Sequence, residues 1–412
     1  MKLLLAALAS LSLQVGFARA EVVEWTNGQW FDGQGFAPRI VWTEQGQIRD
    51  AKPTSVDRVV DLGSRFVIPP FGEAHNHDLA SDHELDENVQ RYLRDGVFYA
   101  KMQSAFSIAT TEDRLNRPDS VDVSYAFAPI TGPGGHPIRL REVFFDRGYY
   151  EGIFQDKAAI AGIGYTEITN LADLKQKWRG LMAQGPDFIK LVLSWSEEYE
   201  LRRDDDEFFG RKGLDPALVP TIVRAAHAAG LRVTAHINTG ADFHHAIAGG
   251  VDEIAHMPGV TQPEVIRRED AATAAEKGVV VVTTLSLTTN IADDYPAWYQ
   301  RVMEQHAANL RRLHEAGVTI AIGSDFPYRD TSLQEAMLVH STGVFSNLEM
   351  LRMWSINAPK TIFPDRRIAC FDAGCEASFL VLEEDPVENF EAVRGIHMRV
   401  KQGHTLALDD SH

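Results

Sequence analysis

The chain has 412 residues, with 58 acidic and 40 basic side chains and a formal net charge of −18 at pH 7. An acidic chain with no basic stripe is poorly suited to bind nucleic acid or an anionic membrane surface, so we expect neither as a partner. The length exceeds that of one ordinary domain and fits a large α/β barrel with a smaller appended domain.

The first 20 residues differ from the rest of the chain. A basic residue at Lys2, an apolar stretch over residues 3–17 and the small residues Ala18 and Ala20 are typical of a secretory signal peptide cleaved after Ala20. The apolar stretch is shorter than the ~20 residues that a membrane span needs. We therefore expect a periplasmic or secreted protein that is not anchored in a membrane.

Short β-like segments occur near both ends of the mature chain. They lie at residues 22–25, 39–42 and 58–62 and again at 377–382 and 395–400, separated by turn residues. Each set is too small to stand alone, so we predict that residues 21–66 and 367–412 form one composite β-domain. Cys370 and Cys375, the only cysteines, either close a small disulfide loop or remain free thiols.

The middle of the chain, residues 67–366, alternates strand-like and helix-like segments. After a first strand that runs into His75 and His77, candidate strands lie at 96–102, 121–130, 187–193, 231–236, 251–256, 279–284 and 318–325. Helical periodicity is found at 171–183, 216–229, 263–277, 299–316 and 332–344. Eight strands alternating with helices predict a closed parallel barrel whose active site lies at the carboxyl ends of the strands.

Potential metal ligands stand at several of these strand ends. His75 and His77 end the apolar run 66–77, and because they are two residues apart they point to the same face of a strand. Three later strands end at His236, His256 and Asp325. Any one of these could be a satisfied core residue, but the joint pattern predicts a metal site built from imidazole and carboxylate ligands.

Lys190 lies inside the apolar run 187–193. A buried ammonium is costly, so this lysine is expected to be partnered, neutral or chemically altered. The alternative is a lysine at a strand edge whose amine reaches water.

Taken together, these segments resemble the amidohydrolase superfamily of metal-dependent hydrolases, in particular its imidazolonepropionase-like and prolidase-like members. The resemblance implies a distorted TIM-like (β/α)8 barrel with a composite β-sandwich, and two divalent metal ions, usually zinc. It assigns His75, His77 and Asp325 to the more buried ion and His236 and His256 to the second, with a carboxylated Lys190 bridging both. Two positions depart from the family pattern, namely Glu73 and Ser378.

The resemblance also implies a reaction. A metal-bridged hydroxide would attack a carbonyl, and Asp325 would pass the proton to the leaving amine. This predicts a hydrolase that cleaves an amide bond in a small molecule or dipeptide. His136, after the glycine-rich residues 131–135, is the expected substrate contact, and Tyr328 and Arg329 could reach a substrate carboxylate or face water.

Two other readings remain open from the sequence. The same metal site could act on a lactone, ester or phosphoester, because an activated hydroxide does not select its electrophile. The second reading is a protein of another class, which binds a metal ion or a ligand without catalysing a reaction. The oligomeric state also stays open, a homo-oligomer included.

Overall fold

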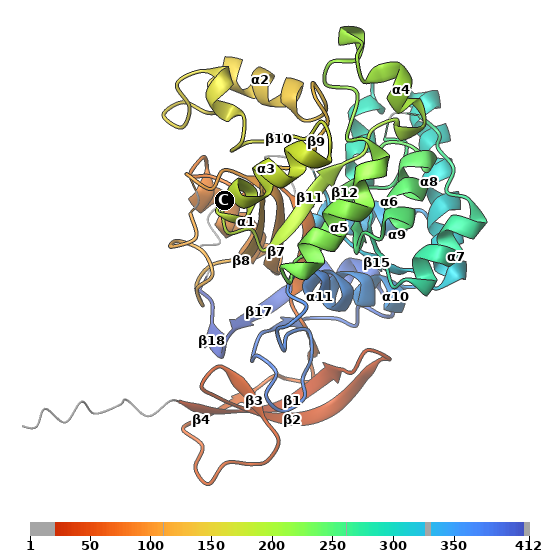
Figure 1. Ribbon diagram of the computed structural model, residues 1–412. Coiled ribbons are helices and arrows are strands. Elements are labelled where there is room, and N and C mark those ends of the chain that lie inside the picture. The colour runs from red at the N-terminus through yellow and green to blue at the C-terminus, as the bar shows by residue number, and fades with distance from the viewer. Residues whose placement is uncertain (1–20, 110, 261, 326–330, 408–412) are drawn as a thin grey trace, which may run out of the picture.

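The computed structural model describes residues 21–109, 111–260, 262–325 and 331–407 (Figure 1). The expected signal peptide over residues 1–20 lies outside the described residues, as do Tyr328 and Arg329. Figure 1 shows a large α/β body above a smaller β-structure built from the two ends of the chain. Among the described residues, no helix is both long enough and apolar enough to cross a membrane.

The smaller body is a mixed sheet of eight strands, in the order β18-β17-β16-β5-β1-β2-β3, with β4 beside β1. Its strands are β1 (Val22–Phe31), β2 (Phe36–Glu44), β3 (Gln47–Arg49), β4 (Arg58–Asp61), β5 (Phe66–Ile68), β16 (Phe379–Leu382), β17 (Ile396–Lys401) and β18 (His404–Thr405). The two chain ends join where β16 pairs with β5.

Aromatic side chains from both ends share the core of this sheet. Trp25 and Trp30 are fully buried, and their rings lie 4.9 and 5.2 Å from that of Phe379. Cys370 and Cys375, just before β16, form a disulfide bond. Neither end could bury these rings alone, which explains why the sheet is composite.

The apolar run expected as one strand over residues 66–77 is two strands. β5 belongs to the composite sheet, whereas β6 (Phe71–Asn76) belongs to the large body. Pro69 and Pro70 separate them, and because proline has no N–H group it cannot continue a hydrogen-bonded ladder. The proline pair therefore marks the passage from the sheet into the large body.

The large body contains a three-stranded sheet, β6-β7-β8, and a seven-stranded sheet, β10-β9-β11-β12-β13-β14-β15. Its further strands are β7 (Val97–Ala105), β8 (Asp122–Phe127), β9 (Ile130–Thr131), β10 (Thr166–Glu167), β11 (Phe188–Val192), β12 (Arg232–His236), β13 (Glu253–Ile254), β14 (Val280–Val282) and β15 (Thr319–Ala321). Neighbouring strands in both sheets are parallel. Each of the eight predicted strands is present, mostly shorter than expected.

Backbone hydrogen bonds connect both edges of the three-stranded sheet to the seven-stranded sheet. Asp187, next to β11, donates its N–H to the carbonyl of Tyr125 on β8 at 2.9 Å. On the other side, Ala74 on β6 donates to Ile322 at 3.0 Å, and Asp325 donates to His75 at 2.7 Å. The eight strands β6, β7, β8 and β11 to β15 thus surround one interior as a distorted barrel.

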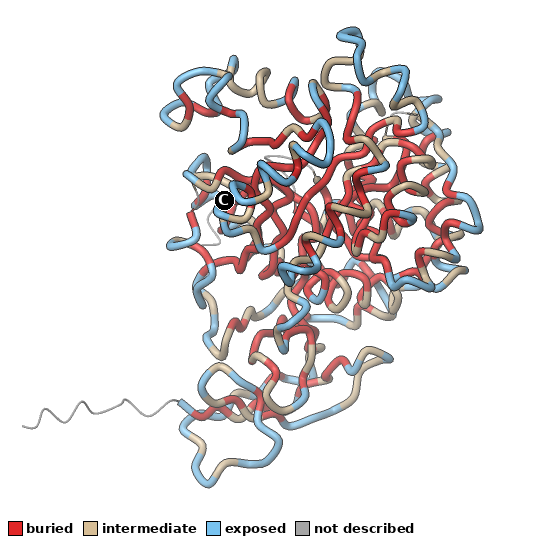
Figure 2. Tube along the Cα trace, viewed as in Figure 1, coloured by how far each residue is buried: buried red, intermediate tan, exposed pale blue. Residues whose placement is uncertain are grey.

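Helices cover the outside of this barrel, while buried residues concentrate in the strands (Figure 2). The α-helices of the described residues are α1 (Leu85–Arg94), α2 (Ile138–Asp146), α3 (Leu171–Met182), α4 (Tyr199–Arg202), α5 (Val219–Ala228), α6 (Gly240–Gly249), α7 (Arg268–Glu276), α8 (Pro296–Ala316), α9 (Ser332–Ser341), α10 (Asn347–Arg352) and α11 (Ala358–Ile362).

Two predicted helices begin later than expected. Residues 216–218 form a 3₁₀ turn before α5, and α7 begins at Arg268 instead of residue 263. The segment before α7 is hydrogen-bonded to α8, because the Asn309 side chain donates to the Glu264 carbonyl at 2.8 Å and accepts from the Ile266 N–H at 3.1 Å. These contacts hold it in an extended path.

The segment over residues 137–165, called here the α2 segment, has a small apolar core separate from the main one. The buried members of this core are Phe106, Ile138, Tyr150, Phe154, Ile160 and Tyr165. In Figure 1, α2 stands beyond the strand ends, apart from the helices that cover the barrel. The α2 segment is thus positioned to form a wall above the barrel.

Candidate active site

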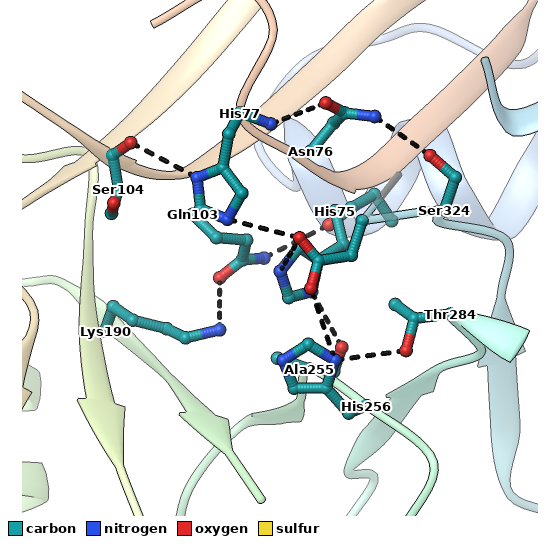
Figure 3. A network of polar contacts seen from close by, with 12 residues as sticks. His75, Asn76, His77, Gln103, Ser104, Lys190, Ala255, His256, Thr284 and Ser324 are labelled. Atoms are coloured by element: carbon teal, nitrogen blue, oxygen red, sulfur yellow. Dashed lines mark hydrogen bonds and ion pairs between the residues drawn. The ribbon is translucent and has the colours of Figure 1, made fainter. Parts of the chain in front are cut away.

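The six predicted metal ligands converge at the carboxyl end of the barrel. They border one cavity of about 450 Å³, together with residues of the α2 segment. The ligands are His75 and His77 at the end of β6, Lys190 on β11, His236 at the end of β12, His256 after β13 and Asp325 after β15. Figure 3 shows how several of these side chains point toward one another.

Asp325 lies at the centre of the cluster. Its Oδ1 atom is 3.4 Å from Nε2 of His75 and 3.3 Å from Nε2 of His77. The ligand atoms of His75, His256 and Asp325 all lie within 4.8 Å of one another, which is close enough to share a metal ion. His236 is adjacent, with its ring centroid 4.4 Å from that of His256.

Hydrogen bonds orient three of the imidazole rings. Nδ1 of His75 lies 2.7 Å from the Ala255 carbonyl, Nδ1 of His77 lies 3.4 Å from the Ser104 carbonyl, and Nδ1 of His256 lies 3.1 Å from Thr284 Oγ1 (Figure 3). A carbonyl oxygen only accepts, so in neutral His75 the hydrogen is on Nδ1. Its Nε2 lone pair therefore faces the carboxylate of Asp325.

This arrangement fits a bound cation. Burial lowers the pKa of His75, His236 and His256 well below the usual value, so their imidazoles are neutral. Burial opposes ionisation of Asp325, but the hydrogen bond and charge of His77 outweigh it and its pKa is lowered. Lone pairs of neutral imidazoles facing a carboxylate repel it unless a cation lies between them, and these groups are good ligands for zinc and similar ions.

Lys190 is buried, with 5% of its surface exposed, so its amine does not reach water. Its Nζ donates to Oε1 of Gln103 at 3.1 Å, and Nε2 of Gln103 donates in turn to the Ala74 carbonyl at 3.1 Å. No carboxylate forms an ion pair with Lys190 in the part of the chain that the structure describes. Burial lowers the pKa of Lys190 to about 7, so much of this amine is neutral near physiological pH.

Glu73, one of the departures from the family pattern, supports the site from behind. It is fully buried and accepts hydrogen bonds from the N–H of His75 at 3.2 Å and from the N–H and hydroxyl of Ser324 at 2.8 and 2.7 Å. One carboxyl group thus connects the two segments that carry His75 and Asp325.

Comparison with known proteins places the chain in a family. The model of the amidohydrolase family matches residues 209–406. An ochratoxinase of Aspergillus niger is 23% identical over 222 residues, which cover 53% of this chain and 45% of that protein. The chain thus aligns with about half the length of this curated relative.

Solved structures share the fold over almost the whole chain. The crystal structure of A. niger ochratoxinase matches with a TM-score of 0.74 at 18% identity, covering 94% of this chain and 96% of that one. A prolidase complexed with N-methylphosphonate-L-proline matches with a TM-score of 0.69 at 18% identity, covering 94% and 100%. Residues 209–406 thus belong to the amidohydrolase family, and almost the whole chain shares the fold of these structures.

In this amidohydrolase, His136 lies in the same cavity as the metal ligands. Its ring stacks on that of His236, with centroids 4.6 Å apart, and burial lowers its pKa to about 4. The glycines before it let the loop fold tightly, since a Cβ atom on Gly135 would lie 2.3 Å from Thr131 Oγ1. Of the three predicted substrate contacts, His136 is the one that the described residues include.

Gln103, Ser104 and Arg141 are among the cavity residues that the sequence pattern did not predict. Gln103 and Ser104 lie on β7, a barrel strand to which no predicted site residue belongs. Arg141 lies on α2, away from the strand ends. An amide and a hydroxyl at the end of a barrel strand were a usable signal, whereas nothing in the pattern around Arg141 pointed to the cavity.

Proposed function

We propose that this amidohydrolase hydrolyses the amide bond of a small molecule or dipeptide with the help of two divalent metal ions, zinc being the expected one. The observation that carries the proposal is that four imidazoles, one carboxylate and one buried lysine line a single cavity. The names of the matched ochratoxinase and prolidase are consistent with a hydrolytic role.

The proposed ligands divide into two sets. His75, His77 and Asp325 would hold one ion, and His236 and His256 the other, with Lys190 between them as a carbamate. A neutral amine is the form that reacts with carbon dioxide, and the burial of Lys190, with no carboxylate partner among the described residues, supports this modification. Bound divalent ions would supply Lewis acidity and lower the pKa of a water molecule.

Two side chains have proposed roles in proton movement and orientation. The ionised carboxylate of Asp325 would accept the proton of the attacking water and deliver it to the nitrogen of the leaving amine. His136 is neutral at physiological pH, so its N–H can donate a hydrogen bond to the carbonyl oxygen of the scissile amide. His136 would thus orient the scissile bond, and Asp325 would transfer the proton from the attacking water to the leaving amine.

We also propose that the protein acts in a periplasm or outside the cell after loss of residues 1–20. The support within the described residues is the disulfide between Cys370 and Cys375, because disulfides persist mainly in oxidising compartments. Detection of Glu21 as the first residue of the exported protein would test this proposal.

The activity is tested with a panel of dipeptides, N-acyl amino acids and lactones. We expect hydrolysis of at least one amide, its loss after dialysis against a chelator and its recovery on addition of Zn²⁺. Metal analysis should give about two ions per chain, and intact mass a Lys190-dependent gain of about 44 Da, the mass of carbon dioxide. Hydrolysis of lactones alone would replace the amide proposal, and inactivity towards all of them would favour a non-catalytic protein.

Asp325→Asn separates catalysis from metal binding. The amide keeps an oxygen ligand but cannot accept the proton, so we expect metal content to be largely retained and kcat to fall by about a hundredfold or more. Full activity of this variant would contradict the role proposed for Asp325. Exposed Asp204, changed to Asn in the same way, serves as the control.

A further inference from the structure

Arg141 is a cation in the wall of the cavity, and it has no anionic partner among the described residues. It lies on α2 and lines the same cavity as the metal ligands. In the part of the chain that the structure describes, no carboxylate forms an ion pair with it. Its Nε atom is buried without any hydrogen-bond partner among those residues. A half-buried guanidinium with an unused Nε donor is favourable for binding an anionic ligand.

Neighbouring side chains hold the guanidinium in a defined position. Nη1 donates to the hydroxyl of Tyr150 at 2.8 Å, and Nη2 donates to the hydroxyl of Ser104. The Phe106 ring lies against it, with Cζ 4.9 Å from the ring centroid. These contacts use two of the five N–H donors, so donors remain for a ligand and little side-chain entropy is lost on binding.

The same contacts fix Arg141 relative to the metal centre. Ser104, whose hydroxyl accepts from Arg141, also faces Nδ1 of His77 with its carbonyl oxygen at 3.4 Å. One residue of β7 therefore positions a predicted metal ligand and the guanidinium together. A substrate held by Arg141 would have its scissile bond at a set distance from the metal site.

The wall around Arg141 is apolar and largely aromatic. Phe106, Phe144, Tyr149, Tyr150 and Leu140 all line the cavity. Leu140 and Tyr149 are 42% and 37% exposed, so part of each side chain can contact a ligand in the cavity. The cavity thus offers one positive group within an apolar surface.

We infer that Arg141 binds the carboxylate of the substrate, and that the residue bearing this carboxylate has an aromatic or large apolar side chain that packs on the α2 segment. This inference rests on the proposed amide hydrolysis and names its substrate class. It describes an N-acyl derivative, or a dipeptide, of an amino acid such as phenylalanine. A neutral amide of the same shape would lose the ion pair but keep the apolar contacts.

The test compares N-acetylphenylalanine with N-acetylphenethylamine, which lacks only the carboxylate. In the metal-loaded enzyme, Arg141→Met should lower kcat/KM for N-acetylphenylalanine by roughly 30- to 100-fold, mainly through KM, because a charge-assisted pair is lost. The same variant should change kcat/KM for N-acetylphenethylamine by less than about threefold, since no ion pair is involved. Arg141→Lys should recover part of the loss.

Arg147→Met is the matched control, because Arg147 is exposed at the end of the same helix and does not line the cavity. It should behave as the wild type towards both compounds. An equal loss for both compounds in Arg141→Met, with normal metal content, would overturn the inference and make Arg141 a structural residue. An unchanged KM for N-acetylphenylalanine would overturn it as well.

A binding measurement separates this inference from the proposed function. Calorimetry with 3-phenylpropanoate and its neutral amide, 3-phenylpropanamide, needs no turnover and can be done on the wild type alone. Tighter binding of the carboxylate, lost in Arg141→Met and kept in Arg147→Met, would support the inference even if no amide were hydrolysed. Equal binding of both compounds by the wild type would overturn it even if amide hydrolysis were found.

Discussion

His306 shows how burial of one titratable side chain makes stability depend on pH. It lies on α8 with 2% of its surface exposed; its Nε2 is 3.1 Å from Thr288 Oγ1, and its Nδ1 has no hydrogen-bond partner among the described residues. Burial lowers its pKa from 6.5 to about 4. Between these values the unfolded chain binds a proton that the folded chain does not, so stability is lost as the pH falls through this window.

His306→Gln should remove this contribution while keeping a polar group near Thr288. Between pH 7 and pH 5, we expect the unfolding free energy of the wild type to fall by about 2 kcal/mol more than that of the variant, at 1.36 kcal/mol per pKa unit. Urea unfolding at both pH values measures the difference. Exposed His404, changed to Gln, is the control, and parallel pH profiles for wild type and His306→Gln would contradict the prediction.

At the residue scale, the positions of the candidate ligands could be predicted because barrel strands end at one place. His75, His236 and Asp325 each follow an apolar strand, so their convergence required only the order of strands. Arg141 could not be predicted in this way. Its position depends on how the α2 segment folds over the barrel, and that depends on contacts such as those with Tyr150 and Ser104, which are distant in the sequence or irregular in spacing.

At the scale of elements, the contact between β6 and the segment after β15 determines the geometry of the candidate metal site. Gly323 lies between the two backbone hydrogen bonds that join them. A Cβ atom there would be 2.6 Å from the N atom of His75 and 2.6 Å from Val282 Cγ1. Only glycine allows β6 to approach this closely, and the approach brings Asp325 to His75.

Gly323→Ala should therefore separate the two segments and disturb the metal site. We expect a loss of about 2 kcal/mol in unfolding free energy, as for other overpacked cores, and a reduced metal content. Gly180→Ala makes the same chemical change in α3, where nothing lies within 4 Å, and should leave stability equal or slightly higher. Chemical unfolding and metal analysis test both variants, and wild-type values for Gly323→Ala would show that the backbone there is compliant.

The bounds of helices and strands could be predicted where apolar residues recur at a regular spacing. They could not be predicted where prolines or side-chain hydrogen bonds interrupt an element. Helices α3, α8 and α9 lie within about three residues of their predicted starts, because an apolar face repeats along each of them. The break at Pro69 and Pro70 was present in the sequence, but continuous apolar residues on both sides concealed it. The late start of α7 depends on Asn309, which lies some forty residues further along the chain.

At the scale of the whole molecule, a buried cluster of charges attaches the composite sheet to the barrel. Lys401 ends β17 in the sheet, and Asp122 begins β8 in the barrel; their side chains are 2.5 Å apart. Asp122 also pairs with Arg366 at 2.7 Å. The union of both chain ends in one sheet was predicted from their β-like segments, but this attachment was not, since charged residues in a sequence do not reveal whether they are buried.

Lys401 is completely buried, and its three N–H donors are all satisfied. They reach Asp122 Oδ1 at 2.5 Å, the Ser120 carbonyl at 2.5 Å and the Arg117 carbonyl at 2.6 Å. Lys401→Met keeps the shape of the side chain but removes one partner of an ion pair and takes the Lys401 donor from the buried Ser120 carbonyl, whereas the Arg117 carbonyl still accepts from the Ser120 N–H. We expect the unfolding free energy to fall by about 3 kcal/mol, because breaking one side of a buried pair is strongly destabilising.

A matched control distinguishes burial from loss of charge. Lys52 also forms an ion pair, at 3.3 Å from Glu24, but 65% of its side chain is exposed, so Lys52→Met should cost less than about 1 kcal/mol. Urea unfolding of both variants, followed by tryptophan fluorescence, gives the comparison, because Trp25 and Trp30 report on the composite sheet. Equal and small effects would mean that the attachment depends on the apolar contacts alone. A large effect for Lys401→Met only would show that the charged cluster stabilises the junction, so that the sheet and the barrel unfold together.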